Sequence, residues 1–553
     1  MAEPNYSLEE PLLYDTFPSD FLWGTATGKF KNWPVNLTKL IYELVYLSAS
    51  YQIEGGWNED GKGESIWDVF TADPTNGNVA NGDNGQVACD SYHKYKEDVQ
   101  LLYNMGVNSY RFSIAWSRIL PRGTGEVNQK GIDYYNNVIN ELLLYNITPA
   151  ITIYHWDLPQ ALQDRGGWLN PEIAYWFEDY SRILFKEFGD RVKFWITLNE
   201  PWVVAIAGHT NGEMAPGMRG PGILEYKVVH NLIRSHAKAY RVYQNEFHAT
   251  QQGQVGITLN SDWFEPQNAT DPDHVQASLT KLQFMIGWFA HPIFVNGKYP
   301  EVMRKKIDEK SQAQGFAESR LPQFTEQESL EIMNSSDFFG LNHYTSSLVY
   351  PTPESEIHPA IISWFKDADV TDYKDGKWYK AASSWLKVVP FGLRRLLTWI
   401  DETYQKPIYV TENGFSDFIG NLDDMQRIYY YKHYINQMLK AIKLDGANVK
   451  GYFAWSLLDN FEWARGYTEK FGLHYVDFND PDRPRTPKES SKFITKLIRD
   501  HGFIPWWQIQ TFYKASLDFL VSPESFTVSG HSDQNVSQDE TDAWNTSDSY
   551  HWL

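Results

Sequence analysis

Eight short apolar segments recur along the chain, each followed by a longer helical or loop segment. Most are continuous apolar runs rather than alternations of apolar and polar residues, which is typical of parallel strands covered on both faces. The eight segments are residues 21–27, 108–116, 148–156, 192–200, 254–263, 337–345, 407–414 and 449–459. Two of the intervening segments, 131–146 and 170–189, have apolar residues at helical spacing. This alternation predicts an α/β fold, a single (β/α)₈ TIM barrel with long βα loops.

A doubly wound parallel sheet is the main alternative, but no glycine-rich phosphate loop follows an early strand. In a barrel, functional groups gather where strands end and βα loops begin. Polar residues do occupy these positions after six of the predicted strands: Arg111, His155 to Asp157, Asn199 and Glu200, Asn342 to Tyr344, Glu412 and Asn413, and Asp459 and Asn460. The barrel is therefore the better interpretation.

The predicted barrel domain covers residues 17–502, and residues 503–553 form a C-terminal extension. Residues 503–521 could form one amphipathic helix that is too polar to span a membrane. From Ser522 onward the chain is rich in Ser, Asp, Asn and Thr, which predicts disorder.

Charge and cysteine content exclude several classes of function. The net charge of −21 argues against nucleic acids and anionic membranes as partners. The single cysteine, Cys89, excludes an internal disulfide framework and a cysteine-based metal cluster. The first residues lack the basic start and apolar run of a secretory signal, so we expect a cytoplasmic protein, or a secreted one if the N-terminus is incomplete.

The chain is rich in aromatic residues, with 22 Trp, 34 Tyr and 31 Phe. Aromatic rings provide flat apolar platforms that suit the apolar faces of sugar rings, and Trp adds a donor at its edge. The alternative is an aromatic-rich core with no role in binding.

Two glutamates end predicted strands next to amide side chains: Glu200 in "ITLNEP" and Glu412 in "YVTENG". Either one alone could be a salt bridge or a loop cap. Together they fit cleavage of a glycosidic bond, in which one carboxyl group protonates the departing oxygen and the other attacks or stabilises the anomeric carbon. Retaining enzymes hold the two groups roughly 5–5.5 Å apart and inverting ones ~6.5–9.5 Å apart. The sequence leaves this distance open, and Arg111 could keep one carboxylate ionised.

The two glutamate motifs resemble the paired signature of glycoside hydrolase family one, the β-glucosidase type. Five further blocks resemble that family in order: "FLWGTAT…ASYQIEGGWNEDGKGESIWDVF", "YRFSIAWSRILP", "YHWDLPQALQDRGGWLN", "GLNHYTS" and "AWSLLDNFEWARGYTEKFGLHYVDF". They extend from about Phe17 to His501 and are most similar to animal, especially insect, members. The resemblance implies a retaining β-glycosidase that acts on terminal β-D-glucosides through a covalent intermediate, without cofactor or metal.

The resemblance also implies roles for individual residues. Glu200 would be the general acid/base and Glu412 the nucleophile, which Arg111 and Tyr344 would orient and stabilise. Asn199 would bind the sugar 2-hydroxyl, and Trp455 would lie under the ring. The implied substrate-binding residues are Gln52, His155, Asn199, Asn342, Tyr344, Trp455, Glu462 and Trp463, and the implied aglycone contacts are Trp202 and Trp385.

Two residues narrow the expected substrate. Glu462 can accept hydrogen bonds from two hydroxyls and would repel a phosphate, which favours a neutral glycone. Glu200 stands where the plant thioglucosidase branch has Gln, which favours O-glycosides. Glucose is the expected glycone, with galactose and fucose as alternatives. A catalytically impaired member that binds sugar or protein is the competing hypothesis, although both carboxylates are present, and the sequence does not separate hydrolysis from transglycosylation.

Residues 28–48 interrupt the first family block. Removing them joins Thr27 to Ala49 and gives the uninterrupted "GTATASYQIEGG". The segment could be a loop at the barrel rim, where functional insertions gather. We favour a retained intron. Gly28-Lys29-Phe30 can be encoded by a sequence that contains the splice-donor string GTAAGT. Ser48 can be encoded by a codon that ends in CA, which with the first G of the Ala49 codon gives the CAG that ends an intron. If the segment is present in the protein, we expect it to displace Gln52 and weaken activity, so deleting 28–48 should raise activity.

Overall fold

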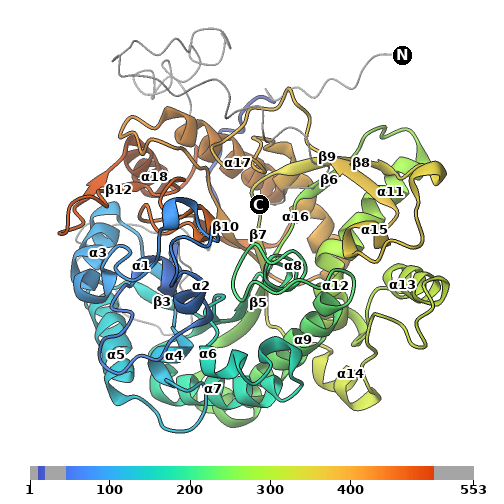
Figure 1. Cartoon of the computed structure of the whole chain (residues 1–553). Coiled ribbons are helices and arrows are strands. Elements are labelled where there is room, and N and C mark those ends of the chain that lie inside the picture. The colour runs from blue at the N-terminus through green and yellow to red at the C-terminus, as the bar shows by residue number, and fades with distance from the viewer. Residues whose placement is uncertain (1–9, 19–20, 22–44, 504–553) are drawn as a thin grey trace.

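Eight parallel strands form a closed barrel in the computed structural model, which describes residues 10–18, 21 and 45–503 (Figure 1). Around the barrel the strands follow the order β1-β11-β10-β7-β5-β4-β3-β2. Their bounds are β1 (Val45–Ser48), β2 (Ser109–Ser113), β3 (Thr148–Tyr154), β4 (Phe194–Asn199), β5 (Gln254–Asn260), β7 (Phe339–Asn342), β10 (Ile408–Asn413) and β11 (Val449–Ala454). The predicted (β/α)₈ barrel is confirmed.

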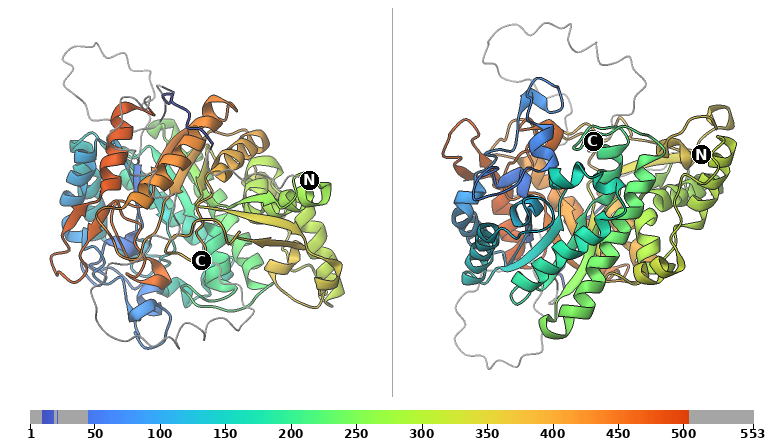
Figure 2. Two further views of the ribbon diagram at one scale, coloured as in Figure 1. Left: turned by 90° about the horizontal axis from the view of Figure 1, so that it is seen from above. Right: turned by 60° about the horizontal axis from the view of Figure 1, so that its bottom comes forward.

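Helices surround the barrel, as both views in Figure 2 show. The longer ones are α3 (Ser91–Met105), α5 (Gln129–Leu144), α7 (Ile173–Phe188), α9 (Leu224–Val242), α11 (Pro272–Leu282), α13 (Glu301–Ala313), α16 (Phe391–Tyr404), α17 (Met425–Lys443) and α18 (Glu489–Asp500). Each longer helix buries one stripe of its surface; in α7, Phe177, Leu184 and Phe188 are buried whereas Tyr175 is exposed. None of the helices within the described ranges is both long and apolar enough to cross a membrane.

Shorter elements form the βα loops. The short helices are α1 (Ser50–Ile53), α2 (Ile66–Phe70), α4 (Trp116–Ile119), α6 (Gln160–Gln163), α8 (Pro201–His209), α10 (His248–Gln251), α12 (Trp288–His291), α14 (Glu326–Ile332) and α15 (Trp364–Asp367). Three strands form a separate sheet, β6 (Trp263–Pro266), β8 (Ser346–Pro351) and β9 (Val370–Tyr373), at the upper right of Figure 1. Two more, β12 (His474–Val476) and β13 (Arg485–Pro487), pair after β11.

Seven predicted strands match β2, β3, β4, β5, β7, β10 and β11, and the two predicted helices match α5 and α7. The observed strands are shorter than the predicted segments. At 192–200, for example, the strand ends at Asn199, because Glu200 has a φ of +44° and the helix α8 begins at Pro201. The extent of an apolar segment in the sequence therefore overestimates the length of the strand that forms ladder hydrogen bonds.

The first strand differs from the prediction of residues 21–27. Residues 22–27 lie outside the described part of the chain, and the first position of the barrel is filled by Val45–Ser48, which pairs with β11 and β2. These four residues are the last four of the predicted 28–48 insert, so β1 and the predicted insert overlap. The sequence "VYLS" has β-branched and aromatic residues that suit a strand, and it leads directly into Ala49 and α1. Residues 28–44 and 504–553 lie outside the described ranges.

The barrel interior is packed with side chains at the N-terminal ends of its strands. Phe194 stacks on Phe338 with ring centroids 4.3 Å apart and contacts Tyr409 edge-on at 5.0 Å. Above this apolar layer the interior becomes polar: Thr258 Oγ1 donates to Thr411 Oγ1 across the barrel at 3.1 Å. The polar layer supports the groups at the C-terminal ends of the strands.

Candidate active site

A cavity of about 690 Å³ opens at the C-terminal ends of the barrel strands. Ten of the residues predicted from sequence line it: His155, Glu200, Trp202, Asn342, Tyr344, Trp385, Glu412, Trp455, Glu462 and Trp463. The other three, Gln52, Arg111 and Asn199, are almost fully buried and lie outside the lining. The structure therefore brings residues from five barrel strands and their loops to one hollow.

Backbone irregularities precede both glutamates. The β4–β5 pairing shifts register between Ile196 and Asn199, and the β10–β7 pairing shifts between Val410 and Glu412. A register shift of this kind re-aims side chains that would otherwise alternate between the two faces of a strand. As a result, the consecutive residues Thr411 and Glu412 both make polar contacts inside the barrel mouth.

Glu412 lies between a cation and a hydroxyl donor. Arg111 Nη1 is 3.4 Å from Glu412 Oε1, and Tyr344 OH donates to Glu412 Oε2 at 2.8 Å. Burial raises the pKa of the Glu412 carboxyl, and the charge of Arg111 and the Tyr344 hydrogen bond oppose that rise. The pKa of Glu412 stays raised overall, but its contacts with Arg111 and Tyr344 favour the ionised form against the effect of burial.

Glu200 has a different environment. The amide Nδ2 of Asn342 donates to Glu200 Oε1 at 2.5 Å, while the ion pair of Arg111 is made with Glu412. Burial, followed by the nearby charge of Glu412, raises the pKa of Glu200 to about 8. At neutral pH Glu200 therefore keeps its proton, while Arg111 and Tyr344 favour ionisation of Glu412, and acid–base chemistry needs two carboxyl groups with such unequal surroundings.

An amide and imidazole chain connects the two glutamates to the barrel wall. Asn342 Nδ2 also lies 3.3 Å from Asn199 Oδ1, and Asn199 Nδ2 lies 3.0 Å from His155 Nε2. Because an amide nitrogen donates, His155 Nε2 accepts and the imidazole proton is on Nδ1. Burial and the charge of Arg111 hold the pKa of His155 well below its usual range, so the ring is neutral.

One side of the cavity is formed by the loop that follows β11. Residues 455–463 carry Trp455, Glu462 and Trp463, and we call this segment the glycone wall. The ring of Trp463 lies 4.5 Å from that of Trp156, centroid to centroid. Gln52 contacts the back of the wall, where its Nε2 donates to Asn460 Oδ1 at 3.0 Å and to Phe461 O at 2.8 Å.

Glu462 is the acidic group of the glycone wall. Burial, with the charges of Glu469 and Glu412, raises its pKa well above the usual value, and a hydrogen bond from the Trp455 side chain opposes that rise. Glu469 also lines the cavity, where Ser383 Oγ donates to it at 2.5 Å. This part of the lining therefore presents carboxyl groups that can accept hydrogen bonds, with Arg465 3.5 Å from Glu469.

Sequence reasoning missed the outer part of the cavity. Trp202 contacts Trp364 edge-on at 5.6 Å, and Lys281 pairs with Asp372 at 2.7 Å. Further lining residues are Phe70, Met214, Phe264, Met285, Phe365, Asp262 and Lys374. Several come from short elements, α2, α15, β6 and β9, which have no periodic pattern, so the high aromatic content was the available signal.

The arrangement can perform acid–base and nucleophilic chemistry. Two carboxyl groups with unequal surroundings line the same cavity, and one amide, Asn342, hydrogen-bonds both of them. Within residues 10–18, 21 and 45–503, no group of three or more His, Cys, Asp or Glu side chains is placed to hold a metal ion.

Comparison with known proteins identifies extensive similarity. A family model described as "Glycosyl hydrolase family 1" matches residues 44–503. Lactase/phlorizin hydrolase of Rattus norvegicus is 50% identical over 501 residues, which is 90% of this chain and 24% of that protein. Cytosolic beta-glucosidase of Homo sapiens is 42% identical, covering 88% of this chain and 98% of that protein. The chain spans about a quarter of the length of the lactase/phlorizin hydrolases it matches.

Among solved structures, aphid myrosinase superposes with a TM-score of 0.79 at 42% identity. The superposition covers 88% of this chain and 99% of the myrosinase chain.

Proposed function

The chain belongs to glycosyl hydrolase family 1, and on this premise we propose that it is a retaining β-glycosidase that hydrolyses terminal non-reducing β-D-glucosides. The observation that carries the proposal is the unequal pair of glutamates in one cavity. Arg111 and Tyr344 contact Glu412, whereas Glu200 meets the Asn342 amide and has a pKa of about 8.

In the first step, Glu412 attacks the anomeric carbon while Glu200 gives its proton to the departing aglycone oxygen. The bond between the anomeric carbon and that oxygen breaks, and a glycosyl ester forms on Glu412. In the second step, the ionised Glu200 takes a proton from water, whose oxygen attacks the anomeric carbon and releases Glu412. Both glutamates return to their starting protonation states.

The glycone is a neutral sugar, with glucose first and galactose or fucose as alternatives. Trp455 provides the platform under the ring, Asn199 binds the 2-hydroxyl, and Asn342 and Tyr344 complete this side of the site. Gln52, His155, Glu462 and Trp463 bind the remaining hydroxyls. Glu462 can accept hydrogen bonds from two hydroxyls, and its carboxyl group, when ionised, would repel a phosphate on the glycone.

The aglycone occupies the outer cavity, which includes Trp202 and Trp385. A volume of about 690 Å³ lies within the range of pockets that enclose whole small-molecule ligands. The retained acid, Glu200, suits O-glycosides, whose leaving groups need a proton. By likeness to human cytosolic beta-glucosidase we place the protein in the cytoplasm, which fractionation of the native cells tests.

The test is turnover of 4-nitrophenyl β-D-glucoside, β-D-galactoside and β-D-fucoside by the wild-type protein and by Glu412→Ala. We expect wild-type turnover of the glucoside and a loss of about 10⁴-fold or more in the variant, because the nucleophile acts as part of a unit. Glu402→Ala, at an exposed position on α16, is the matched control and should retain full activity. Wild-type silence on all three substrates would favour an impaired member that only binds.

A further inference from the structure

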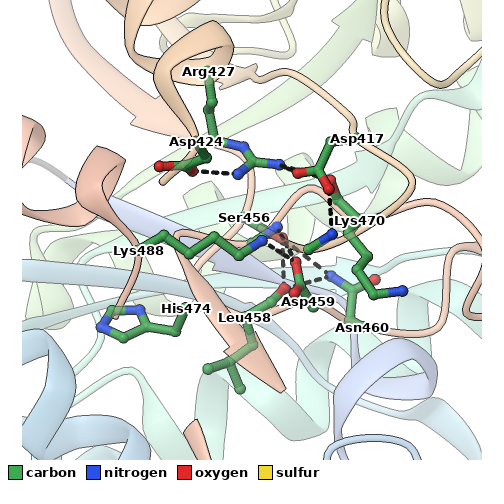
Figure 3. Close-up of polar contacts among 12 residues, drawn as sticks. Asp417, Asp424, Arg427, Ser456, Leu458, Asp459, Asn460, Lys470, His474 and Lys488 are labelled. Atoms are coloured by element: carbon green, nitrogen blue, oxygen red, sulfur yellow. Dashed lines mark hydrogen bonds and ion pairs between the residues drawn. The ribbon is translucent and has the colours of Figure 1, made fainter. Parts of the chain in front are cut away.

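A set of five charged residues lies outside the cavity lining, with Asp459 in the glycone wall itself: Asp417, Asp424, Arg427, Asp459 and Lys488 (Figure 3). Four of them are buried, and Asp417 is partly exposed. We call them the charge cluster. They come from the loop after β10, the helix α17, the loop after β11 and the segment before α18. The mechanism proposed above uses none of them.

Lys488 and Asp459 form the centre of the cluster. Both side chains are 0% exposed, and Lys488 Nζ is 2.8 Å from Asp459 Oδ1. The same carboxylate oxygen accepts a hydrogen bond from Gly472 N at 2.8 Å. Asp459 N donates to His474 O at 2.9 Å, so the residue is fixed to β12 through its backbone as well.

The ion pair is one residue from the contacts that shape the glycone wall. Asn460 Nδ2 donates to Ser456 Oγ at 3.2 Å and to Leu458 O at 3.1 Å, while Asn460 Oδ1 accepts from Gln52. The chain then continues directly to Glu462 and Trp463 in the cavity lining. A shift of Asp459 would therefore move both ends of the wall and its contact with Gln52.

Arg427 connects the wall to the strand that bears the nucleophile. Its Nε donates to Phe415 O at 3.0 Å, three residues after Glu412, and its Nη2 donates to Lys470 O at 2.8 Å. Asp417 accepts from Arg427 Nη2 at 2.5 Å and exchanges backbone hydrogen bonds with Lys470. One guanidinium thus fixes the loop after Glu412 to the loop that continues the wall.

We propose that Lys488 and Arg427 are positioning residues that hold the glycone wall at a fixed place relative to Glu412. Fully buried ion pairs add little net stability, because desolvation offsets their attraction, whereas removing one partner leaves a costly unpaired charge. Such a pair is better suited to fixing geometry than to stabilising a core. The proposal rests on the proposed function in one respect, which is that the glycone wall binds the sugar. That Lys488 holds the wall in place does not depend on the proposed function.

Lys488→Met tests the link, and Arg485→Met is its matched control. Arg485 lies three residues away, is equally buried and pairs at 2.9 Å with Asp98 on α3 rather than with the wall. In Lys488→Met we expect backbone amides of residues 455–466 to exchange hydrogen for deuterium about tenfold faster. The control should leave this segment unchanged.

Kinetics supply the second readout. Displacement of a binding group by about 1 Å can cost ~10²-fold, and loss of uniform glycone binding appears in KM. We expect Lys488→Met to raise KM for 4-nitrophenyl β-D-glucoside about tenfold, with kcat changed by less than about threefold. A merely structural role would leave KM unchanged in the folded fraction.

The double variant Lys488→Met/Asp459→Asn removes both charges and provides a second test should the single variant fail to fold. It leaves no unpaired buried charge, and the new amide oxygen can still accept from Gly472 N. Unchanged exchange in residues 455–466 of the folded variant, or an equal increase in Arg485→Met, would overturn the proposal. Hydrogen exchange does not depend on turnover. A wild-type protein without activity would therefore refute the proposed function, while the exchange measurement would still test whether Lys488 positions the wall.

Discussion

Arg111 contacts four acceptors from three strands, which fixes its guanidinium in one orientation. Besides Glu412, they are Thr152 Oγ1 at 2.8 Å, Thr411 O at 3.0 Å and Asn199 Oδ1 at 2.6 Å. The side chain is fully buried, so its charge acts on Glu412 with little screening. In this way one cation, Arg111, gives Glu412 surroundings that differ from those of Glu200.

Tyr344→Phe tests the assignment of the ionised carboxylate by removing one oxygen atom. The hydrogen bond from Tyr344 OH lowers the pKa of Glu412. Its loss should raise that pKa, so the acid limb of kcat/KM should move to higher pH. A pH profile with 4-nitrophenyl β-D-glucoside measures the shift. An unchanged acid limb would mean that the group that must be ionised in the free enzyme is not Glu412.

The alkaline limb of the same profile belongs to Glu200. Its active form is protonated, so kcat/KM should be constant from the end of the acid limb up to the pKa of about 8 and fall tenfold per pH unit above it. Glu200→Gln should abolish this limb and lower turnover of poor leaving groups by ~10²–10⁴-fold. Persistence of the limb in Glu200→Gln would assign it to another group.

At the residue scale, the motifs around Glu200 and Glu412 were sufficient to predict which side chains meet. They did not indicate that Thr411 and Glu412 would both make contacts inside the barrel, because a regular strand alternates its faces. They also did not place Gln52 behind the glycone wall, since its position depends on hydrogen bonds to Asn460 and Phe461, over 400 residues away in sequence.

At the element scale, the first strand is where sequence and structure differ. Residues 21–27 and 45–48 are both short β-prone segments, and either could precede the next family block. Local propensity does not separate them, because a strand is selected by its ladder partners. In the structure Tyr46 pairs with Tyr110 and Leu47 with Arg111.

Proline substitutions distinguish the two segments. Leu47→Pro should destabilise the protein by about 3 kcal/mol or more, because proline removes a donor from a strand paired on both sides. Ala26→Pro, in the segment predicted from sequence, is the matched variant and should change the melting temperature much less. If Ala26→Pro instead lowers the melting temperature strongly and Leu47→Pro does not, residues 21–27 form the first strand.

The long βα loops were the least predictable elements. The sheet of β6, β8 and β9 contributes Phe264 and Asp372 to the outer cavity, and α15 contributes Trp364. These elements are four to six residues long and have no period to detect. Their placement depends on tertiary contacts such as the Lys281–Asp372 pair.

At the scale of the whole molecule, the count and order of apolar segments were sufficient to predict the closed barrel. Eight parallel strands close a barrel whose interior side chains can fill, which the packed rings of Phe194 and Phe338 illustrate. The family resemblance read from the ordered motifs is confirmed by the match over residues 44–503.

The net charge of −21 should affect substrate choice over a longer range than any contact. We expect kcat/KM for 4-carboxyphenyl β-D-glucoside to rise several-fold as salt increases from 10 to 500 mM, because screening shortens the Debye length from ~30 to below ~10 Å. The neutral 4-nitrophenyl glucoside is the control and should change little. Parallel salt responses would show that the charge of the molecule does not reach the site.

The central claim is that Glu412 becomes covalently attached to the sugar. A 2-deoxy-2-fluoro-β-glucosyl donor with a good leaving group slows both steps and should let the intermediate accumulate, since the fluorine disfavours the positive charge of the transition state. Mass spectrometry of the intact protein, followed by peptide mapping, is the most direct test. The account predicts one added fluoroglucosyl group on Glu412. Its attachment to another residue, or turnover of this donor with no covalent adduct at any time, would contradict it.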